Sequence, residues 1–493
     1  MEDIKSAIIE KAKEFLETRK NSDYLTEILD DLDNYQSTYE AILALEMIFS
    51  ESLKNRSMLT TGDSTNNAPS EHVSWLRDQY ETTWNKLLNL MYDKTNGEQA
   101  ALTLFKLLEH EGKFPLVPPQ KGVYYFPLDK LEIILKQYFN TKITQGALNQ
   151  LDEFTNYIDV VYYLWLLVPS ILTKIKKLDE PLKAKILDIL KEVPIPSEEE
   201  LQDYDPEVLL CVTKNKTKFK PKYAAIQESI HNLWNIIIKW NATSNTHKKV
   251  LVLLIENLMV HLSKPILTMD YLMESLNAGG AVSLLALQGV FTLVKDHNLE
   301  YPNIYGKLYS FFHPSIFYTK YKSRLYVLTN IFLSSTHLPE ALVASYMKRF
   351  ARLCLCAPPQ DIIILCAFIG NLLIRHSGLR KMIQHPEGGS VSSDPYLEDE
   401  LDPMKTKAME SSLWELKTLE QHILPQVSNA VNFINKPLPS VEWDLTPLIE
   451  KTYKDVFEKE CKKKIQKVSV TFERPDSFVV PKTDYFSNLW NFN

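Results

Sequence analysis

Basic and aromatic side chains gather in residues 305–352, where their combined chemistry suits binding to a polyanion. This segment holds seven Lys and Arg residues, one acidic residue and eleven aromatic residues. Basic side chains neutralise phosphates, and aromatic rings stack on unpaired bases. The cations that we consider for contact with RNA or with a protein partner are Lys320, Lys322, Arg324, Lys348, Arg349 and Arg352. The pattern equally suits rings that fill a helical core beneath a solvated basic face, so both interpretations stay open.

A second basic run lies near the end of the sequence and consists of Lys462, Lys463, Lys464 and Lys467. Such a run can serve nuclear import or contact phosphates. It can also be the solvated end of a helix, where cations complement the helix dipole. We retain nuclear import as the functional hypothesis for these lysines.

An acidic cluster offers a different chemistry, because Asp30, Asp31 and Asp33 lie close together in a helical pattern. Mg²⁺ prefers carboxylate oxygens together with phosphate ligands, and some all-helical enzymes hold Mg²⁺-diphosphate on aspartates. A matching second cluster is missing, since the acidic run at 398–402 falls in a predicted loop. A solvated helix end is therefore the favoured interpretation, with a helical enzyme as its rival.

Signatures of known catalytic sites are absent from the sequence. It contains no GxGxxG, GxxxxGK[ST], GxSxG or HExxH motif. Two of the eleven scattered histidines, His376 and His385, flank a predicted helix end. We expect no catalytic residue, no cofactor and no metal. The five cysteines form no CxxC pair, which favours a reducing compartment.

The elements that position these residues are predicted to be helices. Only 13 of 493 residues are glycine, well below the roughly 7% of an average protein, which disfavours hairpins and phosphate-binding loops. Apolar residues recur at helical spacing, as at positions 28, 32, 35, 39, 42, 45 and 49. The same spacing predicts helical segments at 147–177, 360–376 and 406–435, among others. We predict an all-α, irregular HEAT/armadillo-like helical solenoid, with at most one short strand near residues 468–472.

The predicted organisation has two helical halves. Residues 1–193 form an N-terminal helical region, 194–222 a linker or irregular segment, 223–465 a C-terminal helical domain and 466–493 a tail. The net charge of −7 equals that of residues 1–50 alone, so the rest is balanced. The apolar stretches 160–173, 281–294 and 362–374 are too short for a bilayer span of about 20 residues, and we expect them to be buried core helices.

The C-terminal half also resembles a known family. In order along the chain it contains NLEYP (298–302), SSTHLP (334–339), KRFARL (348–353), APP (357–359) and ESSLWEL (410–416). These motifs resemble the CCAAT-binding-factor/Mak-type domain of the nucleolar complex protein four homologues, with a core at 279–435. Lys322 and Leu325 depart from the family pattern, where Arg and an aromatic residue are expected.

The resemblance implies a non-catalytic scaffold of ribosome biogenesis in the nucleolus, within the nucleus. It further implies membership of the small-subunit processome, a role in maturation of small-subunit rRNA, and a complex with nucleolar protein fourteen and other processome proteins. Direct contact with pre-rRNA stays open, and no small-molecule substrate is expected. The alternative is a nucleic-acid-binding protein, for pre-rRNA or DNA, that acts through the 305–352 segment.

Overall fold

The protein is built from helices throughout its described part. The computed structural model describes residues 2–18, 22–33, 37–59, 71–117, 124–175, 178–205, 208–212, 219–241, 243–297, 303–384 and 393–462. Within these ranges every regular element is a helix, which confirms the all-α prediction. The strand predicted at 468–472 lies outside the described residues. The chain divides into two compact units, Met1–Pro302 and Asn303–Asn493.

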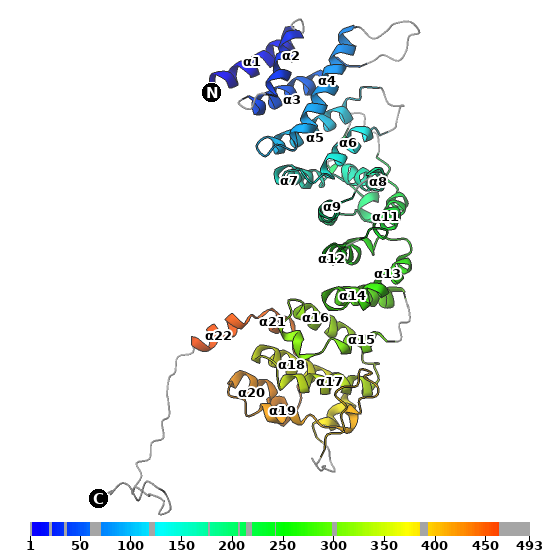
Figure 1. The fold of residues 1–493 in the computed structure, drawn as a ribbon, viewed down its shortest axis with the longest axis vertical. Coiled ribbons are helices and arrows are strands. Elements are labelled where there is room, and N and C mark those ends of the chain that lie inside the picture. Colours follow the sequence, from blue (N-terminus) through cyan, green and yellow to red (C-terminus); the bar gives the residue numbers. More distant parts are fainter. Residues whose placement is uncertain are drawn as a thin grey trace, which may run out of the picture. The chain divides into compact units, whose positions relative to one another are not determined.

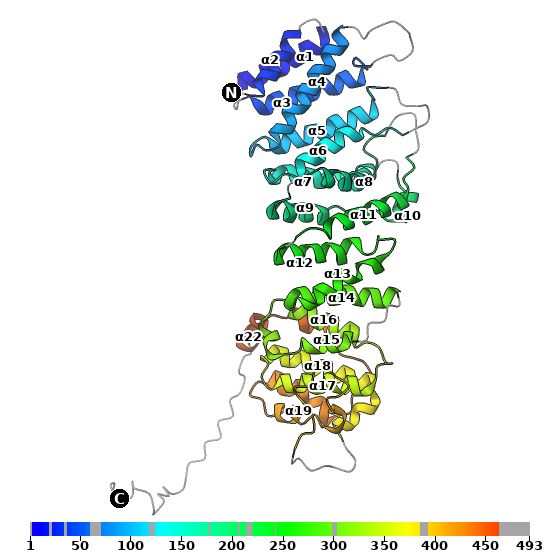
Figure 2. The same ribbon diagram turned by 45° about the vertical axis from the view of Figure 1, so that its right-hand side comes forward.

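The first unit is a stack of helices, each packed on a near neighbour in the chain (Figure 2). Its helices are α1 (Glu2–Thr18), α2 (Ser22–Asp31), α3 (Thr38–Lys54), α4 (Glu71–Leu90), α5 (Gly97–Lys113), α6 (Leu128–Tyr138), α7 (Gln145–Phe154), α8 (Ile158–Lys174), α9 (Glu180–Glu192), α10 (Glu198–Gln202), α11 (Tyr223–Ile237), α12 (Ser244–Leu253), α13 (Met269–Asn277) and α14 (Gly280–His297). Helix α3 packs on α1 and α5, and α8 packs on α6 and α11. This arrangement of successive helix contacts is that of a solenoid.

Helical periodicity identified the core of this stack correctly. Ile28 and Leu32, in and just after α2, and Ile42, Leu45 and Phe49 on α3 are buried. Position 39 is exposed, because it lies on the outer face of the first turn of α3. The predicted face therefore spans two helices rather than one.

The segment predicted to link two halves, residues 194–222, lies inside the first unit. The carboxylate of Asp159, on α8, accepts hydrogen bonds from the backbone N–H groups of Leu210 and Cys211 at 3.0 and 3.1 Å. The indole N–H of Trp165 donates to the carbonyl of Pro194 at 2.8 Å. These bonds fasten the segment to α8, and the whole segment belongs to the compact unit that ends at Pro302.

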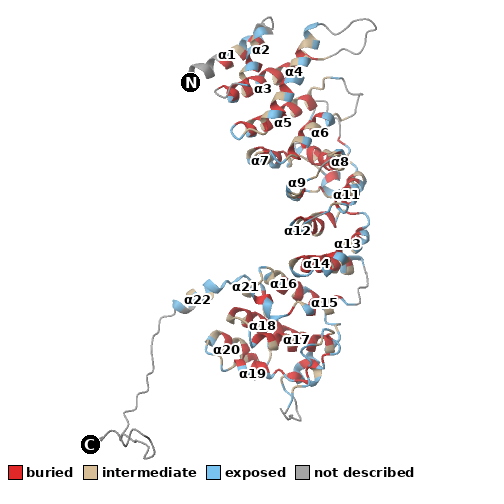
Figure 3. Cartoon of the chain, in the orientation of Figure 1, coloured by how far each residue is buried: buried red, intermediate tan, exposed pale blue. Residues whose placement is uncertain are grey.

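The second unit is centred on two antiparallel neighbours, α17 and α18, whose residues are largely buried (Figure 3). Its helices are α15 (Ile304–Ser310), α16 (Lys322–Phe332), α17 (Glu340–Cys354), α18 (Pro359–Arg375), α19 (Trp414–Leu419), α20 (Pro425–Val431), α21 (Thr446–Glu450) and α22 (Tyr453–Cys461). Short 3-10 turns at Pro314–Tyr318, Ser377–Met382, Ala408–Glu410 and Asn432–Asn435 join them. The irregular segment 393–407 lies against α17.

Two long helices expected from the sequence are broken in the structure. Residues 147–177 contain α7 and α8, which meet at 117°. Residues 406–435 contain only short helices, one of which begins at Pro425. No single described helix has the length and apolar character to cross a bilayer, although α7 and α8 meet those criteria as a bent pair. The apolar stretches at 160–173, 281–294 and 362–374 fall in α8, α14 and α18, and most of their side chains are buried.

Candidate functional site

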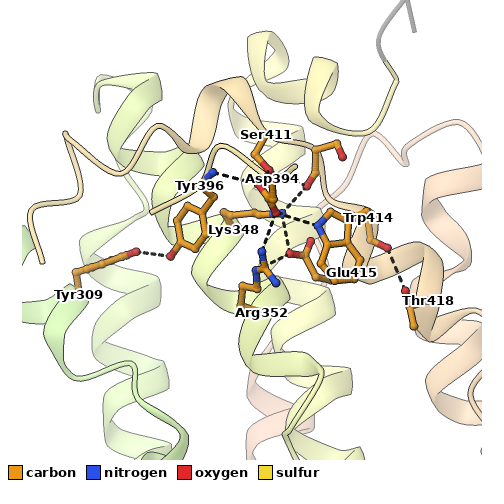
Figure 4. Close-up of polar contacts among 10 residues, drawn as sticks. Tyr309, Lys348, Arg352, Asp394, Tyr396, Ser411, Trp414, Glu415 and Thr418 are labelled. Atoms are coloured by element: carbon orange, nitrogen blue, oxygen red, sulfur yellow. Dashed lines mark hydrogen bonds and ion pairs between the residues drawn. The ribbon is translucent and has the colours of Figure 1, made fainter. Parts of the chain in front are cut away.

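Two of the motifs that carry the family resemblance meet in the second unit. KRFARL places Lys348 and Arg352 one turn apart on α17, so both side chains leave the same face of the helix. ESSLWEL leads into α19 and brings Glu415 to that face, while Asp394 reaches it from the irregular segment (Figure 4). Four ionisable groups from three segments thus converge.

The centre of this Lys348 network is a fully buried ammonium group. Lys348 Nζ lies 2.6 Å from Glu415 Oε1 and 2.8 Å from Asp394 Oδ2, and it donates to the carbonyl of Ser412 at 2.7 Å. Arg352 lies 2.8 Å from Asp394 through Nη2 and 3.0 Å from Glu415 through Nε. Two cations therefore face two carboxylates, and the formal charges cancel inside the unit.

Neutral groups complete the surroundings of Asp394. Its carboxylate accepts hydrogen bonds from Ser411 Oγ at 2.6 Å, from the Trp414 indole N–H at 2.9 Å and from the Tyr396 backbone N–H at 3.1 Å. The Trp414 ring lies 5.4 Å from Lys348 Nζ and 5.0 Å from the Arg352 guanidinium, within the range of cation–π attraction. Figure 4 shows these contacts around the Lys348 side chain.

The two carboxyl groups have opposite pKa shifts. Burial tends to raise the pKa of Asp394, but hydrogen bonds from Lys348, Ser411 and Trp414 outweigh it and hold the pKa below its usual value. For Glu415 burial dominates and raises the pKa, although Lys348 and Arg352 act in the opposite direction. Hydrogen bonds thus take the place of water around the Asp394 carboxylate. The charged form of Glu415 has no such set of donors and is stabilised mainly by Lys348 and Arg352.

The role of this network is structural, because both of its cations are already paired with carboxylates. It fastens the irregular segment and the start of α19 onto α17. Arg349, the neighbour of Lys348, donates to the carbonyls of Phe312 at 2.9 Å and Glu398 at 2.7 Å, which ties the same segment and the residues just after α15 to α17. The Lys348 side chain is fully buried, so it cannot reach RNA or a partner as we expected from the sequence. Arg349 and Arg352 are half-buried and make inward contacts, and their contact with a partner stays a prediction.

Lys322 belongs to a second cluster, at the start of α16. Its ammonium lies 3.0 Å from a buried carboxylate, that of Asp361 in the first turn of α18, and donates to the Tyr453 hydroxyl at 2.9 Å. Both Tyr326 and Tyr453 donate to the same carboxylate, at 3.1 and 2.7 Å. Burial lowers the pKa of Lys322, but these partners outweigh it and raise the pKa overall. Lys322 is therefore an internal link between α16, α18 and α22.

The remaining two predicted cations lie apart from both clusters. Lys320 is exposed between the Pro314–Tyr318 turn and α16, and Arg324 is half-buried on α16. Their contact with a partner or with RNA stays a prediction. Most of the aromatic residues of segment 305–352 lie in the core, in agreement with the interpretation that the rings pack between helices. The buried rings are Tyr309, Phe312, Phe317, Tyr326, Phe332, Tyr346 and Phe350.

The other candidate sites are scattered. Lys462 is exposed just after α22 and lies 3.0 Å from Glu458, while Lys463, Lys464 and Lys467 lie outside the described residues. Asp30 is exposed and Asp33 pairs with Lys86 at 2.9 Å. Across the described ranges no three His, Cys, Asp or Glu side chains come together as metal ligands.

Comparison with known proteins places both units in one group. The CBF/Mak21 family model matches residues 283–431, and the model for nucleolar complex protein 4-like TPR repeats matches residues 1–177. The chain is 35% identical to Nucleolar complex protein 4 homolog A of Xenopus laevis over 97% of this chain and 94% of the relative. It is 34% and 32% identical to the Mus musculus and Homo sapiens Nucleolar complex protein 4 homologs, each over 89% of this chain and 86% of the relative.

Proposed function

The chain belongs to the family of nucleolar complex protein 4 homologues, and from this premise we propose that it is a non-catalytic scaffold of ribosome biogenesis. Its location is the nucleolus, in keeping with the names of its relatives. One observation carries the proposal. The polar residues of the family motifs, Lys348, Arg352 and Glu415, are paired with one another inside the second unit. Side chains used in this way make a rigid surface for binding, since they hold loops in place instead of meeting a substrate.

We further propose that the protein acts in the small-subunit processome in complex with nucleolar protein fourteen, through its second unit. The exposure of helix α22, in the second unit, favours a binding partner at this helix. A helix of nine residues is marginal in water on its own, and none of the described side chains of α22 is buried. Phe457, on this helix, leaves 70% of its surface exposed. A partner that covers Phe457 would stabilise the helix by removing apolar surface from water.

Affinity purification tests the partner. The full chain, tagged and expressed in cells, should retain nucleolar protein fourteen as its main partner by mass spectrometry. Phe457→Glu should reduce that recovery at least several-fold, because a charge cannot enter an apolar contact without desolvation. Leu267→Glu is the matched control, since Leu267 is also apolar and 57% exposed but belongs to the first unit. Equal recovery with all three proteins would remove α22 from the interface, and absence of nucleolar protein fourteen would overturn the partner itself.

Depletion tests the process. Loss of the protein should lower mature small-subunit rRNA and leave large-subunit rRNA nearly unchanged, as measured by gel or hybridisation of total RNA. The reverse pattern would refute a role in the small-subunit processome. Re-expression of the unaltered chain should restore the small-subunit rRNA.

A further inference from the structure

A pocket of about 450 Å³ lies in the second unit, away from the Lys348 network. One wall follows the Ser377–Met382 turn and includes Arg380 and Gln384. The facing wall follows the Asn432–Asn435 turn and includes Phe433, Asn435 and Lys436. The pocket therefore joins two segments about fifty residues apart in the chain, and neither belongs to the basic stretch that the sequence singled out.

The electrostatics of this pocket are one-sided. Arg380 and Lys436 line it, and no acidic residue does. Within the described part of the chain neither cation has a carboxylate within ion-pair distance. Arg375 offers a contrast five positions earlier, since Glu442 holds its guanidinium through two contacts of 2.8 and 2.6 Å. Two cations that face one pocket from opposite walls, with no acidic residue in the lining, favour an anionic ligand.

The shape and polar groups of the pocket narrow the ligand further. Phe433 and Pro437 supply apolar wall. The Gln384 amide offers donors and an acceptor, whereas the Asn435 amide already donates to the Glu420 carboxylate and offers its carbonyl oxygen. A nucleotide matches this set, because its phosphate meets cations, its base covers apolar surface and its base edge bonds to amides. An acidic peptide would use the two cations and could bond to the amides through its backbone, but its acidic side chains would leave the apolar wall uncovered.

The walls are held by contacts of their own. The backbone N–H of Leu413 donates to the carbonyl of Met382 at 2.9 Å, which fixes the first wall. On the second wall the Phe433 ring packs against Trp443 with ring centres 5.7 Å apart. The pocket is thus formed before a ligand binds, so binding loses little conformational entropy of the protein.

We propose that this pocket binds a nucleotide of single-stranded RNA, with Arg380 and Lys436 on the phosphate and the Gln384 amide and the Asn435 carbonyl oxygen on the base. The inference goes beyond the proposed scaffold function, because a scaffold can work through protein contacts alone. It also moves direct RNA contact from the 305–352 segment to a different set of residues.

Fluorescence anisotropy with the purified full chain and a labelled oligouridylate tests the proposal. Arg380→Ala combined with Lys436→Ala should weaken binding by about tenfold or more, because hydrogen bonds to charged groups are lost. The slope of log K against log salt should fall by about 0.7, since both cations meet one phosphate and each single-strand phosphate contact contributes about that much. Gln384→Ala should weaken binding a few-fold without a change in slope. All three side chains are exposed, so thermal melting by circular dichroism should be unchanged.

Lys320→Ala is the matched control, because Lys320 is an exposed cation of the same unit outside the pocket. It should leave the RNA affinity within about twofold and the salt slope nearly unchanged. The proposal is overturned if the chain does not bind oligouridylate at low salt, if the double variant binds as tightly as the unaltered chain, or if Lys320→Ala has an equal effect. It is also overturned if a polyglutamate peptide, and not RNA, binds in a way that needs Arg380. Recovery of nucleolar protein fourteen by the double variant should be normal, so failure here is distinct from failure of the scaffold proposal.

Discussion

At the scale of single residues, the second unit depends on a buried charge cluster rather than on apolar packing alone. A buried ion pair is weak evidence of net stabilisation, because desolvation offsets much of the attraction. Removal of one partner is a different matter, since the other charge is left without compensation. For Lys348 the group left behind is Glu415, whose side chain has no exposed surface.

Lys348→Ala should therefore destabilise the second unit by about 3–5 kcal/mol, as for other buried pairs that lose one member. Urea titration of the full chain, followed by tryptophan fluorescence, measures this as a lower midpoint for the transition of that unit. Lys405→Ala is the matched control, because Lys405 pairs with Asp402 at 3.1 Å in solvent. Equal midpoints for Lys348→Ala and the unaltered chain would show that the network contributes nothing.

The pKa of Asp394 leads to a prediction about pH. The folded-state pKa lies below the unfolded value of about 3.9, so ionised Asp394 stabilises the fold above that value. The stabilisation is lost as pH falls from about 4 toward the folded pKa. Asp394→Asn should lower the free energy of unfolding at neutral pH, and its difference from the unaltered chain should shrink below about pH 4.

Urea titrations of both proteins between about pH 7 and pH 3 measure this difference. The raised pKa of Glu415 has the opposite sign, but both proteins contain Glu415, so the comparison largely cancels its contribution. A difference that is constant across the series would contradict the assignment to Asp394.

Sequence reasoning found the cations of this network and missed the anions. Glu415 stands in the quoted ESSLWEL motif and Asp394 in an acidic stretch, and neither was given a role as a counter-ion. Segment 305–352 has seven cations and one acidic residue, so buried cations within it required counter-ions from elsewhere in the chain. Periodicity cannot identify those counter-ions, because they come from irregular segments brought near only by the fold.

At the scale of elements, residues 442–453 form a C-terminal strap across α18. Asn371 of α18 exchanges two hydrogen bonds with the backbone of Trp443, at 2.9 and 2.8 Å. Beside it the Trp443 ring lies over Gly370, where a methyl group would meet the indole atoms at 3.0 Å or less. Glycine is needed here for close approach of the ring, and not for any unusual backbone angle.

Gly370→Ala should therefore destabilise the second unit, although alanine is normally better than glycine in a helix by about 1 kcal/mol. In a Trp443→Ala background the same change should become neutral or stabilising, because the clash is gone. A double-mutant cycle from urea midpoints measures the coupling. Destabilisation by Gly370→Ala in both backgrounds would mean that the strap is not its cause.

The ends of a helix were predictable where one continuous helix accounts for the whole spacing pattern. The expected helix at 360–376 corresponds to α18 at Pro359–Arg375. The expected helix at 406–435 was wrong, because Pro425 starts a new helix and the pieces on both sides keep apolar residues at helical spacing. A spacing pattern that continues through a turn cannot show where the chain changes direction.

At the scale of the whole molecule, the boundary of the first unit has a direct test. Helix α11 packs on α8, and Ser229 donates to the carbonyl of Trp165 at 2.5 Å. A fragment 1–302 should fold as a soluble helical protein with cooperative melting. A fragment 1–193 should aggregate, because it exposes the face of α8 that α11 covers. Size-exclusion chromatography and circular dichroism distinguish these outcomes, and a stable 1–193 fragment would restore the boundary first expected from the prolines.

The all-α architecture could be predicted from the sequence. The few glycines disfavour hairpins, and helical spacing along most of the chain favours a helical solenoid. The division at 302/303 was not accessible, because it depends on which helices bury one another's faces. Proline-containing stretches such as 194–222 look like linkers in a sequence. Here buried Asp159 binds the stretch to its own unit.

The strap also affects when the second unit can complete its fold during synthesis of the chain. Trp443 follows its partner Asn371 by 72 residues, so synthesis at about 5–20 residues per second leaves α18 without its covering for about 4 to 14 s. During that interval the ring site over Gly370 is open and Arg375 has no Glu442. The first unit, complete by then, can fold on the ribosome, whereas the second must wait for residues 442–453. A premature stop codon shortly before Trp443 would thus release a long chain that lacks the strap and leaves this face of α18 uncovered.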